Sequence, residues 1–195
     1  LDAVCRYLPS PLDVPAPTGV KNEENILIKP DPEAPSVALV FKVQLEEKRK
    51  LSLLRIYSGT IRAGDAIHNA SQKTDERISR IFRLHADRRE QLSEASAGDI
   101  VAVMGLRGSR TGDTITAPHA PVLLERVDEY HPVISLALEP RNSEEGKTLD
   151  EALERYQAED PTLTASLDEG SGHRIVSGMG ELHLEVLLER MRREY

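Results

Sequence analysis

The chain contains little of several residue types, and each shortage excludes a class of structure. Among 195 residues there is one cysteine, Cys5, no tryptophan and only 4% aromatic residues. A single cysteine excludes an internal disulfide and any metal site built from several cysteines, and it is typical of a reducing compartment. Because aromatic side chains are so few, the 39% of residues that are hydrophobic must form an aliphatic core. No apolar run approaches the length of a membrane span, so we expect no membrane partner.

The sequence also lacks the motifs of common catalytic sites. It has no GxxxxGK loop ending in Ser or Thr, so it offers no recognisable cradle for a nucleotide phosphate, and it has no GxSxG motif. Its six histidines have neither the i, i+4 spacing of a zinc-binding helix nor neighbouring cysteines: His68, His85, His119, His131, His173 and His183. We therefore predict no catalytic residue, no cofactor and no metal within these residues.

The two ends of the sequence are typical of a piece of a longer protein. Residues 1–8 have the apolar spacing of the last turns of a helix, which Pro9 and Pro11 end. The sequence begins with Leu1 rather than methionine and carries no secretory signal. It closes at Tyr195, directly after an amphipathic helix. We therefore expect an interior segment.

Charge is distributed unevenly along the chain, although the formal net charge is −8. Residues 36–124 hold 14 Lys and Arg against 10 Asp and Glu, a balance of +4. Residues 125–195 hold 8 against 17, a balance of −9. The sequence therefore predicts two modules of opposite charge.

A proline-rich stretch precedes the first module. Residues 12–35 contain five prolines and little periodicity, so they favour extended backbone over helix. Only Ile26 and Ile28 indicate a short strand. We interpret residues 1–35 as the end of a preceding domain followed by a linker.

The first module, residues 36–124, has an all-β pattern. Strand-like stretches recur at 37–45, 51–59, 60–69, 76–84, 98–106 and 112–116, separated by polar turns. The dipeptide Gly-Asp occurs three times, at Gly64-Asp65, Gly98-Asp99 and Gly112-Asp113, each before an apolar strand. Glycine supplies positive φ and aspartate bonds nearby backbone, which indicates a structural role. Short, regularly spaced strands predict a closed β-barrel or sandwich.

The second module, residues 125–195, changes to a mixed pattern. Strands are predicted at 133–140, 162–168 and 173–179, the last two joined by a turn at 169–172. A helix is predicted to begin at Thr148, because Glu151 three residues later completes a capping box. A second helix follows Gly178-Met179-Gly180. The order β-α-β-β-α matches a ferredoxin-like α+β fold without its last strand.

Basic residues of the first module are candidates for RNA contact. They are Arg77, Arg80, Arg83, Arg88 and Arg89, with Lys50 from a second cluster, Lys48-Arg49-Lys50. Clustered Lys and Arg contact RNA phosphates with an affinity that falls as salt rises. The alternative is a solvated, charged sheet edge that resists aggregation. No aromatic residues suited to base stacking accompany the arginines.

Several strings of the sequence resemble elongation factor G, the translational GTPase family that drives ribosomal translocation. LDAVCRYLPSPLDVPAP resembles the exit from its GTPase domain. LSLLRIYSGTIRAGD and AGDIVAVMGLRGSRTGDTIT resemble its second domain. PVISLALEP and SGMGELHLEVLLERMRREY resemble its third domain. Together these strings cover nearly the whole chain.

The resemblance implies a translation-factor β-barrel followed by a ferredoxin-like domain. It implies that the barrel contacts small-subunit ribosomal RNA and that the third domain helps relay GTP hydrolysis into movement. GTP and magnesium would bind the GTPase domain of the parent protein, not these residues. The implied partners are the small ribosomal subunit and the parent's GTPase and distal domains. The implied location is the cytoplasm, with an organellar matrix left open.

On this interpretation the turn before the last helix is a candidate for contact between domains. It contains polar side chains beside a tight backbone, and the candidates are Gly178, Met179, Gly180, Glu181 and His183. The alternative is a helix start that only packs inside its own domain.

Several related functions remain open from the sequence. RIYSGTI, AIHN and ERISRIF resemble the recycling branch of elongation factor G, and the charged stretch 46–50 departs from the usual first hairpin loop. Tetracycline ribosomal-protection proteins and release factors of the same superfamily are further alternatives. A stand-alone interaction module is the alternative of another class.

Overall fold

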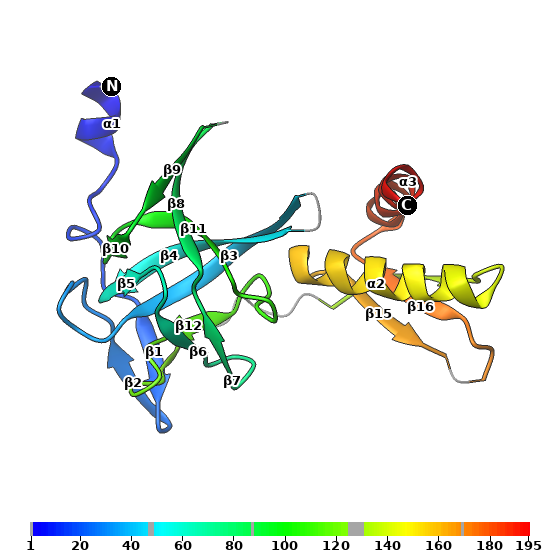
Figure 1. Cartoon of the computed structure of the whole chain (residues 1–195), viewed down its shortest axis with the longest axis horizontal. Coiled ribbons are helices and arrows are strands. Elements are labelled where there is room, and N and C mark those ends of the chain that lie inside the picture. The colour runs from blue at the N-terminus through cyan, green and yellow to red at the C-terminus, as the bar shows by residue number, and fades with distance from the viewer. Residues whose placement is uncertain (1, 47–48, 87, 125–130, 169) are drawn as a thin grey trace. The chain divides into compact units, whose positions relative to one another are not determined.

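The computed structural model describes residues 2–46, 49–86, 88–124, 131–168 and 170–195. The chain divides into two compact units, Leu1–Arg126 and Val127–Tyr195. Figure 1 shows that strands dominate the first unit and that two long helices accompany the strands of the second. The predicted boundary between Leu124 and Glu125 adjoins residues 125–130, which lie outside the described residues. That boundary stays a prediction.

The first unit begins with a short helix, α1 (Asp2–Tyr7), which ends before Pro9 as the sequence predicts. Thirteen strands follow among the residues of this unit that the structure describes. They are β1 (Thr18–Lys21), β2 (Glu24–Leu27), β3 (Val37–Glu46), β4 (Arg49–Ser58), β5 (Thr60–Arg62), β6 (Ala66–Asn69), β7 (Thr74–Arg77), β8 (Arg80–His85), β9 (Arg88–Leu92), β10 (Glu94–Ser96), β11 (Ile100–Met104), β12 (Thr114–Thr116) and β13 (Leu123–Leu124).

Eight of these strands form one antiparallel sheet in the order β7-β6-β12-β3-β4-β11-β8-β9, and β5 pairs with β10 separately. β7 lies at one edge of the large sheet, yet only Ile78 and Ser79 separate it from β8 near the other edge. Ile78 is fully buried, and Ser79 N–H donates to Met104 O at 2.7 Å. The sheet must therefore curl back on itself, which confirms the predicted barrel. Its core is aliphatic, with Val40, Leu54, Ile56, Ile67, Ile81, Val103 and Ile115 among its buried residues.

The three Gly-Asp dipeptides make the same turn. Gly64, Gly98 and Gly112 have φ values of 97°, 98° and 93°. Each following aspartate donates its N–H to the carbonyl three residues earlier and accepts that residue's N–H on its carboxylate. Positive φ at the third turn position is the geometry of a type II turn, which favours glycine. The structural role predicted for the repeat is confirmed.

The predicted linker contains a β-hairpin instead of only extended chain. β1 and β2 pair through a two-residue turn, in which Asn22 and Glu23 both have positive φ, and β1 also pairs with β13. Ile28 packs with Val37, Val122 and Leu124 in a small separate cluster. The short strand indicated at Ile26 and Ile28 is present as β2, whereas β1 gives little local signal because its partner β13 lies about a hundred residues away in the chain. The assignment of residues 1–35 to a domain end and a linker stays a prediction.

The second unit confirms the predicted β-α-β-β-α order. Its elements are β14 (Ile134–Leu138), α2 (Ser143–Glu159), β15 (Thr164–Leu167), β16 (Arg174–Gly178) and α3 (Glu181–Glu194). The strands form an antiparallel sheet in the order β14-β16-β15. Its core holds Ala152, Leu153, Tyr156, Leu163, Val176, Leu184 and Leu187. Each helix therefore packs through one apolar face, with Ala152, Leu153 and Tyr156 on α2 and Leu184 and Leu187 on α3.

The start of α2 differs from the prediction. The helix is capped by Asn142, whose side chain accepts the N–H groups of Glu144 and Glu145 at 3.0 and 2.8 Å. Thr148 lies inside the helix, where its hydroxyl donates to Glu144 O. The prediction that the helix begins at Thr148 was wrong. Asn142 provides an equivalent cap earlier in the chain, and the helix that begins there is longer.

Candidate functional site

The five candidate arginines of the barrel unit do not share one face. Arg80 and Arg83 both lie on β8, and side chains three residues apart on a strand point to opposite faces. In the β8-β9 pairing, Arg83 lies opposite Glu90 and Arg88 opposite His85, whereas Arg89 lies opposite Leu84. Strand alternation therefore groups Arg83 with Arg88 on one face of this hairpin and Arg80 with Arg89 on the other.

The arginines also differ in their partners. Arg83 Nη1 lies 3.9 Å from Glu90 Oε2, a loose ion pair between exposed side chains. Arg77, Arg80 and Arg88 are exposed and form no ion pair with any described residue. These three side chains are free to bind an anion, since no carboxylate among the described residues neutralises them.

Lys50 is the exception among the basic candidates, because its ammonium points into the protein. Its Nζ donates to Arg107 O at 2.9 Å and also to Ser109 O. Burial lowers the pKa of Lys50 from its ordinary value, and the charges of Glu76 and Asp113 oppose that shift. Lys48, from the same predicted cluster, lies outside the described residues.

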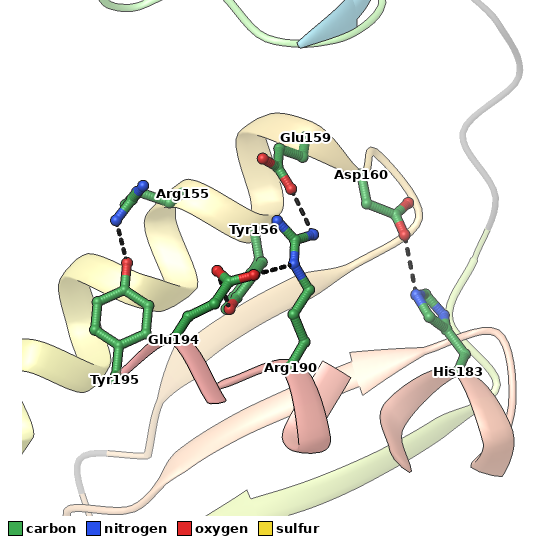
Figure 2. Close-up of polar contacts among 8 residues, drawn as sticks. All are labelled: Arg155, Tyr156, Glu159, Asp160, His183, Arg190, Glu194 and Tyr195. Atoms are coloured by element: carbon green, nitrogen blue, oxygen red, sulfur yellow. Dashed lines mark hydrogen bonds and ion pairs between the residues drawn. The ribbon is translucent and has the colours of Figure 1, made fainter. Parts of the chain in front are cut away.

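The turn Gly178–His183 is packed against its own unit. A Cβ on Gly178 would lie 2.9 Å from both His183 Nδ1 and Leu184 Cδ2, so a larger residue there would force these side chains to shift. His183 Nδ1 accepts the Met179 N–H at 3.2 Å. His183 Nε2 lies 2.9 Å from Asp160 Oδ2, and Figure 2 shows this contact between the two side chains. The accepting Nδ1 places the proton on Nε2, so His183 bridges the turn to the end of α2.

The other candidates in this turn are available at the surface. Met179 is 42% exposed, and Glu181 is exposed at the start of α3. Gly180 caps α3, and a Cβ built there would meet no atom within 4 Å. Gly178 and His183 are thus explained by internal packing, whereas Met179, Gly180 and Glu181 remain free for a contact with another domain.

A polar cluster that the sequence did not reveal joins α2 to α3 (Figure 2). Arg190 donates to Glu159 at 2.7 Å and to Glu194 at 2.8 Å, and its guanidinium lies 4.8 Å from the centre of the Tyr156 ring. Tyr156 donates its hydroxyl to Glu194 at 3.0 Å. Burial, and then this bond to Glu194, raises the pKa of Tyr156, so the hydroxyl stays a donor. The i, i+4 spacing of Arg190 and Glu194 was the only local signal.

The described residues offer no metal centre and no membrane-spanning helix. No three His, Cys, Asp or Glu side chains among them are grouped so that they could hold a metal ion. None of the helices that the structure describes has both the length and the apolar character needed to cross a membrane. The arginines of the barrel and the turn before α3 stay predictions as binding surfaces.

Two family models match the two units in sequence order. The model described as elongation factor G domain 2 matches residues 35–118. The model described as elongation factor G, domain III, matches residues 131–195. Together they cover most of the barrel and nearly all of the α+β unit.

Curated relatives match the chain over its whole length. Elongation factor G 1 of Geobacter sulfurreducens is 50% identical over all of this chain and 29% of its own length. Elongation factor G 2 of Streptomyces coelicolor is 49% identical over 28% of its length, and elongation factor G of Thermotoga petrophila is 46% identical over 28%. The chain thus spans less than a third of the length of the relatives it matches. It belongs to the elongation factor G family, of which it carries the second and third domains.

Proposed function

We propose that this chain is the part of a translational GTPase that binds the small ribosomal subunit and couples GTP hydrolysis to translocation. The observation that carries the proposal is the set of exposed arginines without ion pairs on the barrel unit: Arg77, Arg80 and Arg88. Unpaired arginines attract RNA phosphates, and the barrel segment 36–124 has a balance of +4. Residues 125–195 have a balance of −9, which disfavours RNA contact by that segment.

The proposal assigns no catalysis to these residues. GTP and magnesium would bind a GTPase domain of the whole protein, since this sequence has no phosphate-binding loop of the GxxxxGK type. Residues 1–35 would lead out of that domain, residues 36–124 would form the ribosome-binding barrel, and residues 125–195 would form the coupling domain. The remaining domains of the protein are its further partners, and the cytoplasm is its proposed location.

The first test is binding of the purified chain to small ribosomal subunits over a range of salt concentrations. We expect weak association. The logarithm of the association constant should fall linearly with the logarithm of the salt concentration. Reversing both charges, Arg80→Glu with Arg83→Glu, is expected to weaken binding about tenfold or more at low salt. Sedimentation or fluorescence anisotropy would measure the dissociation constants.

The control for that test is Lys147→Glu, which reverses one exposed charge on α2 of the acidic unit. Because Arg80 and Arg83 point to opposite faces of the hairpin, the two single variants would also identify the face that binds. Absence of binding at low salt, or unchanged binding by the double variant, would contradict a ribosomal RNA contact through these arginines.

A second test concerns coupling and uses the full-length protein. Glu181→Ala is expected to slow translocation while leaving GTP affinity unchanged, because Glu181 is exposed at the turn and makes no ion pair with a described residue. Glu185→Ala, which removes an exposed carboxylate one turn further along α3, is the matched control. Equal loss of translocation and of GTP affinity would count against a coupling role for Glu181.

A further inference from the structure

The loop between β11 and β12 is held unusually firmly for an exposed connection. In each of the four residues 107–110, one backbone N–H or C=O group forms a hydrogen bond with the side chain of another residue. Lys50 Nζ binds the carbonyls of Arg107 and Ser109, and Glu76 Oε2 accepts the Gly108 N–H at 3.0 Å. Asp113 Oδ2 accepts the Arg110 N–H at 2.8 Å. The backbone of this loop therefore has little freedom left.

Polar groups beneath the loop have few other roles. Ser52 Oγ lies 3.1 Å from Ser109 Oγ, and both serines are fully buried. Glu76 Oε1 is buried and has no hydrogen-bond partner among the described residues, and the negative charge of Glu76 attracts the ammonium of Lys50 through space. Burying the charges of Lys50 and Glu76 costs free energy. The hydrogen bonds that both side chains form with the backbone of the loop offset this cost.

Arg107 and Arg110 are the two charged residues of this loop segment. Both are exposed, and neither forms an ion pair with a described residue. The nearby carboxylates of Glu76 and Asp113 face inward, and Asp113 is occupied by Arg110 N–H, Asn69 and Gln72. Two unneutralised guanidinium groups are thus presented on a fixed backbone.

The same end of the barrel also brings Arg77 close to the loop. Gly105, just before the loop, approaches the backbone of Arg77 so closely that a Cβ would lie 2.2 Å from Arg77 O. The loop has no aromatic residue, and its one large apolar side chain, Leu106, is buried. Such a surface offers no aromatic ring for base stacking and no apolar anchor for a protein side chain, whereas its guanidinium groups suit phosphate oxygens well.

We propose that Arg107 and Arg110 bind backbone phosphates of ribosomal RNA and that Lys50 is the positioning residue that holds their loop. This inference rests on the proposed function and changes one of its candidates: Lys50 acts from beneath the surface, not as an RNA contact. Because the loop is fixed before binding, little conformational entropy is lost on association. The contact is to phosphate, so it contributes affinity without sequence preference.

The test compares binding of the chain and of its variants to purified small ribosomal subunits. Arg107→Gln with Arg110→Gln is expected to weaken binding about tenfold or more and to reduce the slope of log affinity against log salt by about 1 to 2. The control variant, Arg141→Gln with Lys147→Gln, also removes two positive charges, but from exposed positions of the α+β unit. It should change neither the affinity nor the salt slope.

Lys50→Met separates positioning from contact. If Lys50 only holds the loop, affinity falls severalfold while the salt slope stays unchanged, since no phosphate contact of its own is lost. A slope reduced by about 1 would instead show that Lys50 binds phosphate, which overturns its assigned role. Circular dichroism and a thermal melt would establish the temperature range in which this variant is folded, and binding would be measured within that range.

The outcomes distinguish this inference from the proposed function. If the unaltered chain binds and the Arg107/Arg110 double variant binds with the same affinity and slope, the loop assignment is wrong and the proposed function stands. If the unaltered chain does not bind small subunits even at low salt, both are wrong. A loss in the loop variants that the Arg141/Lys147 control does not show supports the inference.

Discussion

Replacing Gly105 by alanine is expected to destabilise the barrel by about 3–5 kcal/mol, more than any surface change in this unit. Gly105 has a φ of 111°, which L side chains rarely adopt. An added Cβ would lie 2.2 Å from Arg77 O and 2.8 Å from Ser79 N. The first atom is the carbonyl oxygen at the end of β7 and the second lies in the short connection to β8, so relief of the clash requires the Ser79–Met104 hydrogen bond to move.

Gly64→Ala is the matched control for this prediction. Gly64 has a φ of 97°, but a Cβ there would meet no atom within 4 Å. Its cost should therefore be limited to the backbone strain, about 1–2 kcal/mol. Urea denaturation followed by circular dichroism measures both variants, provided that their m-values agree. Equal losses for the two variants would show that the approach of Gly105 to Arg77 is not a rigid feature of the barrel.

The sequence predicts those parts of the barrel whose cause is local. Each Gly-Asp turn needs only a glycine with positive φ and an aspartate that bonds the backbone three residues earlier. The break between β7 and β8, in contrast, has no cause within the neighbouring sequence. Residues 76–84 are predicted as one strand, but Ile78 and Ser79 leave the ladder because of bonds to Asp65 and Met104. Those partners lie 13 and 25 residues away in the chain.

The candidate site is predicted in its chemistry but not in its geometry. Basic residues on the barrel are evident from the sequence, yet the inward direction of Lys50 depends on carbonyls 57 and 59 residues away. Arg80 and Arg83 are three residues apart, a spacing that shares a face only on a helix. On β8 the same spacing separates them. The direction in which a side chain points depends on how its strand is paired. The spacing of residues along the chain does not reveal that pairing.

The start of α2 shows why local signals can compete. Asn142 and Thr148 are each followed three residues later by a glutamate, so both match the pattern of a helix start. Gly146 between them disfavours helix and makes the later start look better by propensity. In the structure Gly146 is buried within the helix, near Arg174. Packing of the unit therefore decides the start of α2 against the propensity of its first turns.

Leu184→Ala is expected to destabilise the α+β unit by about 2–5 kcal/mol. Leu184 is only 1% exposed, packs over Gly178 and belongs to a core of seven buried residues. A unit as small as Val127–Tyr195 is marginally stable, with about 5 kcal/mol as the order of magnitude. The substitution therefore removes a large fraction of its stability, and we expect α3 and β16 to lose most of their protection from amide hydrogen exchange.

Leu182→Ala tests whether burial, and not the loss of a leucine from α3, causes this effect. Leu182 is 71% exposed and lies two residues before Leu184 on the same helix. Its replacement should change the free energy of unfolding by no more than about 0.5 kcal/mol. The barrel has a separate core, so its amides should keep their protection in both variants. If Leu184→Ala lowered protection in the barrel equally, the two units would have to unfold as one cooperative body.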